Sequence, residues 1–387
     1  MLKIVIGHSD DVDSRDAIIE ILTQCKKDLG KLKPNAGLLF SSIDYEHVVM
    51  LKSIRRKFPG LELIGCTTDG EISSILGFKE DSVTLILFYS DSISIKAGLG
   101  RDLSKSIKNA AKDAVSTAKK KLRKKKPTLC ITVPESLTVS GVKILKGLKH
   151  ELGNEFPIFG GTAGDQYRMK KTLQFYNDEI YTDSIPVLLF SGPILFSAGI
   201  SSGWKPIGKK RRVTKVKDNV IFEVDNKPAL DYYMHYFGAG STLFGEYPIA
   251  VFNKRTNKNF YIRSPIFFNK ENKSITYSAD IPKNAFIQFA EGTRDNIISA
   301  AKDSVESALK NYPGKNPKAA VIFSCSARKS LLGTRTKEEF NLVKDVIKND
   351  IPVSGFYTYG EIGSCHSCKV TNFHNSTFIT LLLGEKD

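Results

Sequence analysis

The sequence predicts a mixed α/β fold in which three repeated strand–helix–strand–helix–strand units form mixed sheets flanked by helices, with a β-rich insertion in the middle. Three observations lead to this prediction. Similar segments recur along the chain, short apolar runs alternate with amphipathic stretches, and each copy carries a glycine-containing loop that ends in an acidic residue. Self-similarity of this kind is the usual sign of repeated structural units.

The copies are recognised by short matching segments. AAKDAVSTA at 110–118 matches AAKDSVESA at 300–308, and RDAII at 15–19 matches RDNII at 294–298. Each copy then continues with a short apolar run, and these runs are AGLLFSS (36–42), TLCITV (128–133) and AAVIFS (319–324). Such continuous apolar runs are typical of strands that are covered on both faces.

The helices of each copy follow from their apolar period and from prolines. In the second copy one helical stripe contains Ile107, Ala111, Ala114, Val115, Ala118 and Leu122. Second helices are expected at 44–57, 139–152 and 336–349, and the prolines that end them are at 59, 157 and 352. Final apolar runs at 82–88, 185–190 and 376–383 can pair antiparallel, whereas strand–helix–strand connections favour parallel pairs.

Residues 193–290 differ from the repeats, because several strand-like runs there are joined by turns. One helix is expected at 228–238, between a proline at its first turn and a glycine at its end. We therefore expect an N-terminal domain at 1–224 with two repeat units. A C-terminal domain at 225–387 would contain the third unit and the β-rich segment.

Composition excludes several classes of protein. The chain has 387 residues, of which 41% are hydrophobic and 25% charged, which is ordinary for a globular protein. No apolar stretch approaches the roughly 18 residues of a membrane span. Six scattered cysteines fit a reducing compartment, so we expect a cytoplasmic protein without a membrane span.

The net charge of +16 raises the alternative of a basic protein associated with nucleic acid. Two clusters, KKKLRKKK at 119–126 and KKRR at 209–212, hold eleven of the positive charges. The first cluster follows a predicted helix, where lysines favour the negative pole of the helix dipole. No aromatic residue alternates with either cluster, so we do not expect nucleic acid to be the partner.

The glycine loops are GCTTDGE (65–71), GGTAGD (160–165) and GFYTYGE (355–361). Such loops expose backbone N–H groups beside a carboxylate, and an arginine could take the carboxylate of a zwitterion while an acid takes its ammonium group. Turn geometry, with the acids bracing the turn, is the structural alternative. The candidate ligand-binding residues are Asp69, Gly70, Glu71, Gly161, Gly164, Asp165, Arg263, Arg328, Tyr359, Gly360 and Glu361.

Catalytic signatures are missing from the sequence. It has no G-x-S-x-G elbow, P-loop, H-E-x-x-H or complete dinucleotide fingerprint. We expect neither an enzyme nor a cofactor. A cysteine-dependent enzyme that uses Cys66 or Cys325 stays a second alternative, although no histidine is placed by the sequence to serve either thiol.

A possible metal site lies near the C-terminus. Cys365 and Cys368 have C-x-x-C spacing, and His366 and His374 are close in sequence. The usual second pair of zinc ligands is missing, so we interpret CHSC as a loop with two free thiols and expect no metal there.

Several segments together resemble the FIST sensory domains. They occur in the order expected of the family's N-terminal and C-terminal parts, and they are GCTTDGEI, FGGTAGD, SGWKPIG, EVDNKPALDYY, IRSPIFF, GFYTYGEIG and NFHNSTFITLLL. Apart from Arg328, the candidate residues named above lie within these segments, as do Trp204 and His374. The CHSC insertion departs from the family pattern.

The resemblance implies an intracellular sensory module that binds a small ligand such as an amino acid. Family members are often joined to signalling output domains, and the two FIST parts fill the 387 residues. We therefore expect a stand-alone sensor that acts through a partner protein or through oligomerisation.

Overall fold

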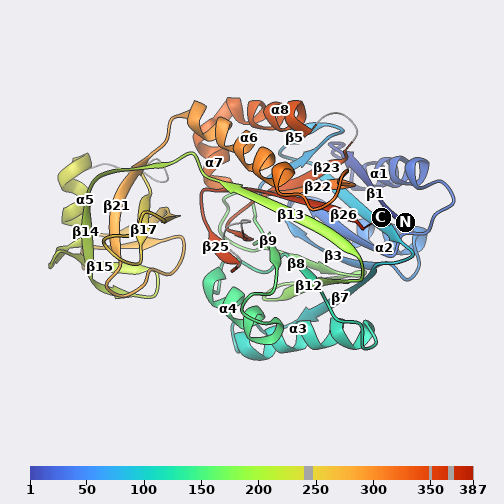
Figure 1. Ribbon diagram of the computed structural model, residues 1–387, viewed down its shortest axis with the longest axis horizontal. Helices are drawn as coiled ribbons and strands as arrows, with labels where there is room; N and C mark the ends of the chain where they lie inside the picture. Colours follow the sequence, from blue (N-terminus) through green and yellow to red (C-terminus); the bar gives the residue numbers. More distant parts are fainter. Residues whose placement is uncertain (239–246, 348–350, 365–369, 387) are drawn as a thin grey trace.

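The computed structural model describes residues 1–238, 247–347, 351–364 and 370–386, and it confirms the mixed α/β class (Figure 1). The described residues form a body of three six-stranded mixed sheets with helices on their outer sides, and a smaller lobe with an eight-stranded sheet. Within them, no helix combines the length and the apolar composition needed to cross a membrane.

The first sheet is built mainly from the N-terminal part of the chain. Its strands, in spatial order, are β1 (Leu2–Ser9), β6 (Val83–Ser90), β2 (Ala36–Ser41), β3 (Glu62–Thr67), β10 (Gln174–Tyr176) and β11 (Glu179–Tyr181). Its helices are α1 (Ser14–Leu29) and α2 (His47–Lys57). Asp13 caps α1 by accepting hydrogen bonds from the N–H groups of Arg15 and Asp16. β2 and β3 are parallel, as expected for a strand–helix–strand unit.

The second and third sheets have the same arrangement. The second is β7 (Ser94–Gly100), β12 (Ile185–Ser191), β8 (Leu129–Thr132), β9 (Ile158–Gly161), β24 (Glu361–Gly363) and β25 (Asn372–His374), with helices α3 (Ile107–Lys121) and α4 (Gly141–Leu152). The third is β13 (Ile194–Ser201), β26 (Phe378–Glu385), β22 (Ala319–Cys325), β23 (Val353–Thr358), β4 (Glu71–Ser73) and β5 (Gly77–Lys79). Its helices are α6 (Arg294–Lys310), α7 (Ser326–Leu332) and α8 (Thr336–Ile347), with a 3₁₀ turn at Gly333–Arg335.

The three sheets are linked by exchanged hairpins. The hairpin β4–β5 follows β3 of the first sheet in the chain but pairs with β23 of the third sheet. In the same way, β10–β11 pairs with β3 of the first sheet, and β24–β25 pairs with β9 of the second. The exchange closes a ring, so the chain segments that lead into these hairpins meet where the three sheets adjoin.

Each sheet is buried on both faces. A single apolar cluster lies between the inner faces and takes Ile4 from the first sheet, Ile131 from the second and Val321 from the third. Separate clusters lie beneath the helices, for example Ile18 of α1 and Ala114 of α3. The burial on both faces explains why most of these strands are continuous apolar runs.

Glycine permits the closest helix–sheet contact. A side-chain methyl group at Gly100 of β7 would overlap the carbonyl oxygen of Ala110 in α3, and one at Gly199 of β13 would overlap that of Ser304 in α6. The absence of a side chain at these two positions therefore allows both helices to lie directly on their strands.

The lobe contains the strands β14 (Lys205–Lys217), β15 (Val220–Val224), β16 (Lys227–Pro228), β17 (Ile249–Phe252), β18 (Tyr261–Arg263), β19 (Pro265–Asn269), β20 (Ser274–Tyr277) and β21 (Phe286–Glu291), and the helix α5 (Ala229–Phe237). It has its own apolar core, which includes Tyr233 and Phe289. Two connections join it to the body, one from β13 to β14 and one from β21 to α6 (Figure 1). The expected domain division at residue 225 lies within this lobe, after β15, and stays a prediction.

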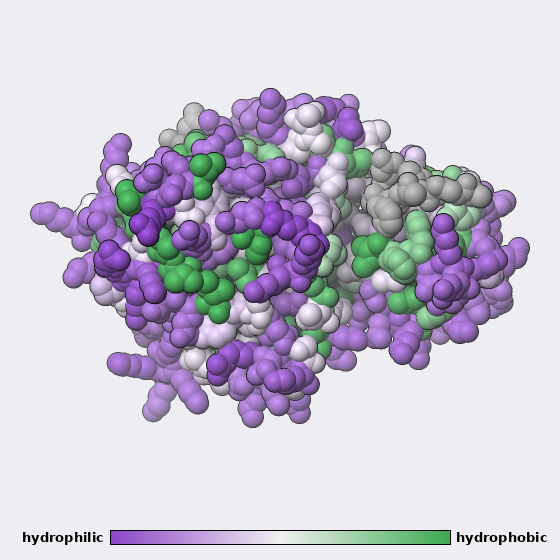
Figure 2. Space-filling view, turned by 180° about the vertical axis from the view of Figure 1, so that it is seen from behind, coloured by the Kyte–Doolittle hydropathy of each residue, from purple (hydrophilic) through white to green (hydrophobic). Residues whose placement is uncertain are grey.

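The surface is polar, as the many charged residues of the sequence suggest. The face drawn in Figure 2 is mainly hydrophilic, and its hydrophobic residues occur in small groups. Surfaces of this kind are ordinary for globular proteins.

Candidate functional site

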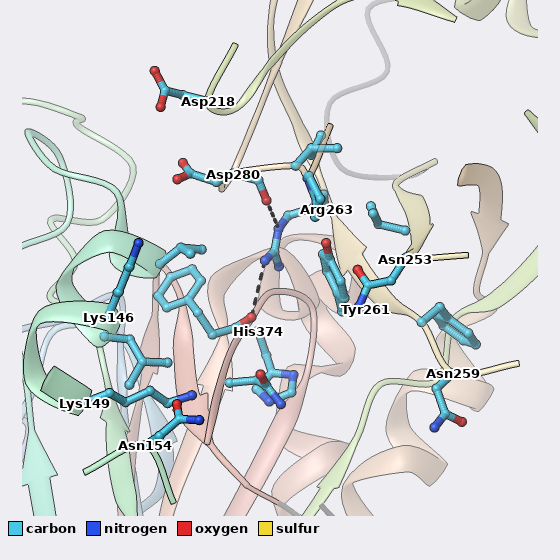
Figure 3. Close-up of a pocket in the computed structure, with 18 of the residues that line it drawn as sticks. Lys146, Lys149, Asn154, Asp218, Asn253, Asn259, Tyr261, Arg263, Asp280 and His374 are labelled. Carbon is cyan, nitrogen blue, oxygen red and sulfur yellow. Dashed lines mark hydrogen bonds between the residues drawn. The ribbon is translucent and has the colours of Figure 1, made fainter. Parts of the chain in front are cut away.

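A cavity of about 1310 Å³ lies between the lobe and the body (Figure 3). One wall is the lobe, with residues from β17, β18 and the loop before β21. The facing wall is α4 together with β25. The charged residues at the cavity are Lys146, Lys149, Asp218, Arg263 and Asp280, and it is also lined by Asn154, Asn253, Asn259, Tyr261, Phe373 and His374.

Arg263 ends β18, and its side chain is buried at the lobe wall, with 3% of its surface exposed. Its guanidinium group donates to the carbonyl oxygen of Ile262 (2.9 Å) and to Oδ1 of Asn375 (3.0 Å), with longer contacts to the carbonyl oxygens of Asp280 and Phe373. No carboxylate of the described residues lies within ion-pair distance. Burial lowers the pKa of Arg263 to about 10, so the group is a buried cation held by neutral acceptors.

Asp280 lies beside Arg263, because its carbonyl oxygen accepts the Nε–H of Arg263 at 3.4 Å (Figure 3). Its Oδ1 is buried and has no hydrogen-bond partner among the described residues. An unpartnered buried carboxylate oxygen is unfavourable. The lobe wall therefore presents a cation and a carboxylate from two residues that touch through the backbone carbonyl of Asp280, and neither charge is paired with an ion of opposite charge in the described part of the chain.

The facing wall adds positive charge. Lys146 is exposed and Lys149 is half-buried on the face of α4 that borders the cavity, and Lys149 extends into it in Figure 3. Neither ammonium group has a hydrogen-bond or ion-pair partner among the described residues. Burial lowers the pKa of Lys149 below its usual value.

His374 also lines the cavity, with Nε2 3.2 Å from the carbonyl oxygen of Gly363. Burial lowers its pKa to about 4, so it is neutral at pH 7. Cys365 and Cys368, the other candidate ligands of a metal, lie outside the described residues. Across the ranges that the structure does describe, no group of three or more His, Cys, Asp and Glu side chains could hold a metal ion.

The three glycine loops meet in the body, outside the lining of this cavity. The N–H of Gly164 donates to the carbonyl oxygen of Thr67 (2.8 Å), and the N–H of Asp69 donates to that of Tyr357 (3.0 Å). A side-chain methyl group at Gly161 would lie 2.7 Å from Oγ1 of Thr358. The loops are thus packed against one another, and none of their residues lines the cavity.

The acids after the loops have protein partners. Glu71 Oε2 accepts from Ser82 Oγ (2.6 Å), and Glu361 Oε2 accepts from the N–H and Oγ1 of Thr377 (2.9 and 2.7 Å). Burial raises the pKa of both carboxyl groups to about 8. They begin the exchanged strands β4 and β24, so their contacts brace the hairpins.

Asp165 and Asp69 differ in their surroundings. Asp165 accepts from Tyr359 (2.7 Å) and from the N–H groups of three following residues; burial acts to raise its pKa, but these hydrogen bonds lower it overall. Asp69 is fully buried, with Oδ1 3.4 Å from Nζ of Lys329, and burial raises its pKa to about 6.

Gly70 and Gly360 share in the same packing. The carbonyl oxygen of Gly70 accepts the N–H of Tyr357 (2.8 Å), and that of Gly360 accepts the N–H of Thr162 (2.9 Å). The proposed ligand-binding role of the loop residues stays a prediction.

Arg328 has a buried carboxylate partner. Its Nε donates to Oε1 of Glu339 at 3.0 Å, and both side chains are fully buried. Its other nitrogens donate to the carbonyl oxygens of Ser202 (2.7 Å) and Ile297 (2.6 Å). Of the two arginines considered from the sequence, Arg263 therefore lies at the cavity and Arg328 does not.

No sequence motif marks Asp280, Lys146 or Lys149 as site residues. Asp280 lies between a strand and a proline without a motif around it. The two lysines are three residues apart on α4, and that spacing is equally typical of a solvated helix face.

Several side chains of the basic clusters contact other parts of the protein. Lys121 pairs with Glu62 (2.8 Å), Lys125 donates to Ser94 Oγ (2.7 Å), and Lys210 donates to the carbonyl oxygen of Arg255 (3.0 Å). A hollow of about 580 Å³ is lined in part by Lys96, Lys121, Arg123 and Lys125. Cys66 and Cys325 are buried, and burial raises the pKa of both thiols well above its usual value.

Comparison with protein families gives two matches. The FIST N domain matches residues 35–227, and the FIST C domain matches residues 229–364. A curated relative, the uncharacterized protein MJ1623 of Methanocaldococcus jannaschii, is 25% identical over 301 residues, which are 72% of this chain and 55% of the relative. The chain thus spans about half the length of that relative.

Two solved structures resemble the fold at a distance. The cyanuric acid hydrolase of A. caulinodans aligns with a TM-score of 0.41 and 9% identity, covering 100% of both chains. A chorismatase aligns with a TM-score of 0.38 and 7% identity, covering 99% of this chain and 98% of the other. At these scores neither likeness supports an argument about function.

Proposed function

This chain belongs to the FIST family of sensory domains, and we propose that it binds a small amino-acid-like ligand in the cavity between its lobe and its body. The observation that carries the proposal is the pair formed by Arg263 and Asp280. The guanidinium group of Arg263 contacts the backbone carbonyl oxygen of Asp280, and neither this buried cation nor the buried carboxylate oxygen of Asp280 has a partner of opposite charge among the described residues.

An α-amino acid carries the two complementary charges close together. Its carboxylate and its ammonium group are attached to one carbon atom, so a receptor needs a cation and an anion that are neighbours. In our proposal Arg263 binds the carboxylate and Asp280 accepts from the ammonium group, and both are charge-assisted hydrogen bonds. Each contact would relieve a charge that is costly to bury alone.

The position of the cavity supports a sensory role. A ligand held there contacts the lobe and α4 at once, and the two parts are joined directly by the ion pair of Lys143 with Asp218 (2.8 Å). Binding would change how firmly the lobe is held against the body. We propose that a partner protein recognises this difference, and that no catalytic step or cofactor is involved.

Of the residues expected from the sequence, this proposal gives ligand contact to Arg263. The glycine loops and the acids after them would act by fixing the body on which α4 and β25 are placed. Their buried hydrogen bonds support that structural role.

The experiment is a thermal-shift screen with the common amino acids, followed by isothermal titration calorimetry of any compound that raises the melting temperature. A ligand present at about 100 times its Kd should add about 2.7 kcal/mol to the free energy of unfolding. Asp280→Asn should weaken binding about tenfold or more, since a hydrogen bond to a charged group contributes about 1.5–3 kcal/mol. The matched control is Asp303→Asn on the exposed face of α6.

Equal affinity in Asp280→Asn and in the control would contradict this site. If no amino acid raises the melting temperature of the unmodified chain, the proposed ligand class is wrong.

A further inference from the structure

We infer that the ligand is an acidic amino acid, whose side-chain carboxylate binds Lys149 on the wall opposite Arg263. This inference rests on the proposed function, because it specifies the ligand of that same cavity.

Cationic side chains outnumber carboxylates at the cavity. Apart from histidines, three cationic side chains line it, Arg263, Lys146 and Lys149, against the carboxylates of Asp218 and Asp280. Asp218 is already paired with Lys143, which lowers the pKa of this aspartate. If the α-carboxylate and the ammonium group of a ligand neutralise Arg263 and Asp280, Lys146 and Lys149 still lack an anion.

Lys149 is the main reason to expect a second carboxylate on the ligand. It lies in the last turn of α4, it is half-buried, and no acceptor among the described residues contacts its ammonium group. Its lowered pKa has burial as its only cause, so no nearby carboxylate offsets the loss of water. A ligand carboxylate would supply the missing partner.

The geometry separates the two anion sites. Arg263 belongs to the lobe, whereas Lys149 belongs to α4 on the facing wall (Figure 3). One carboxylate therefore serves Arg263 and a different one serves Lys149. An α-amino dicarboxylic acid carries both, on the two ends of a short chain, and a cavity of about 1310 Å³ leaves room for it.

Comparing each acidic amino acid with its amide tests the contact with Lys149 most directly. L-Glutamine and L-asparagine have nearly the shape of L-glutamate and L-aspartate but lack the second charge. We expect the unmodified chain to bind at least one of the acids about tenfold more tightly than its amide, as measured by titration calorimetry, because a charged contact of this kind is stronger than a neutral one. Lys149→Gln should remove most of that preference and leave the affinity for the amide nearly unchanged.

Two further variants complete the experiment. Lys146→Gln tests the neighbouring lysine on the same face, and Lys112→Gln, on the exposed surface of α3, is the matched control. The unliganded melting temperature of each variant shows whether it folds. Lys149→Gln removes no hydrogen bond or ion pair among the described residues, so its melting temperature should match that of the control.

The outcomes distinguish the two proposals. Amides that bind as tightly as the acids, or a preference for acids that survives in Lys149→Gln and Lys146→Gln, would overturn the inference and leave the proposed function standing. Failure of all amino acids to bind would overturn both.

Discussion

Glu71 and Gln174 occupy corresponding positions in two different sheets. Each begins the first strand of an exchanged hairpin, and each accepts a hydrogen bond from a serine, Ser82 at 2.6 Å for Glu71 and Ser184 at 3.2 Å for Gln174. Glu361 takes the third such position, with Thr377 as its donor. A neutral amide thus performs in one sheet what a carboxyl group performs in the others.

This correspondence predicts the pH dependence of stability. The pKa of Glu71 is about 8 in the folded chain against 4.5 for the free side chain, so the folded state keeps a proton that the unfolded state releases between about pH 4.5 and 8. Stability contributed by this group is present at low pH and is lost as the pH rises through that range. Glu71→Gln should remove this loss of stability, because a glutamine side chain has no proton to release. Gln174 already occupies the equivalent position in the first sheet.

Urea unfolding at pH 5 and pH 8 measures the effect. Because one pKa unit corresponds to about 1.4 kcal/mol, Glu71→Gln should gain a few kcal/mol over the unmodified chain at pH 8 and little at pH 5. Glu155→Gln, at an exposed position, should gain nothing at either pH. A gain that is the same at both pH values would mean that the carboxyl group is not protonated in the fold.

Arg328→Gln is predicted to be strongly destabilising. It removes one member of a fully buried ion pair and leaves the Glu339 carboxylate without its cation, a change that typically costs about 3–5 kcal/mol. Chemical denaturation measures the free energy of unfolding. Arg335→Gln removes the next arginine in the sequence, which is half-buried at the surface, and should change the free energy of unfolding only slightly. Similar losses in both variants would argue against the buried pair.

Gly100→Ala should also destabilise the fold, because the new methyl group would overlap the carbonyl oxygen of Ala110 and push α3 away from β7. Gly147→Ala is the matched control: its methyl group would lie 3.1 Å from a movable side-chain atom of Ile107, and alanine favours the helix α4 by up to about 1 kcal/mol. We expect a lower melting temperature for the first variant and an unchanged or higher one for the second. The reverse order would contradict the close packing of α3.

Cys66 and Cys325 should react slowly with iodoacetamide at pH 7. Both thiols are buried and protonated, and the thiolate is the reactive form. Peptide mass spectrometry would locate the label, and the same chain in guanidinium should be labelled quickly at both positions. Rapid labelling of either thiol in the folded chain would revive the alternative of a cysteine-dependent enzyme.

The local elements of the fold were predictable from the sequence. The apolar stripe from Ile107 to Leu122 matches α3 closely, and the apolar runs at 36–42 and 319–324 match β2 and β22. These features depend on neighbouring residues only. The hairpin exchange was not predicted, because pairing of Glu71 with Phe356 joins residues that are far apart in the chain and leaves no periodic signal.

The same limit applies to the site. Arg263 was found because an arginine in a motif segment is conspicuous, but its neighbour Asp280 comes from another loop. Arg328 was considered for the same reason, and its partner Glu339 belongs to a helix whose charged residues are expected to face solvent. Glu339 is instead fully buried, where it also accepts from Tyr357 (2.7 Å). Such pairings are decided by tertiary packing.

The exchanged hairpins have a consequence for synthesis on the ribosome. The strand β4 is synthesised early, yet its partner β23 is the segment Val353–Thr358. The edge of the hairpin that pairs with β23 therefore has no partner strand until almost the whole chain has left the ribosome. Until then the nascent protein would display an unsatisfied strand, which is a risk for aggregation. We expect fragments that end before β23 to aggregate. They should aggregate less when the missing C-terminal piece is supplied as a separate chain.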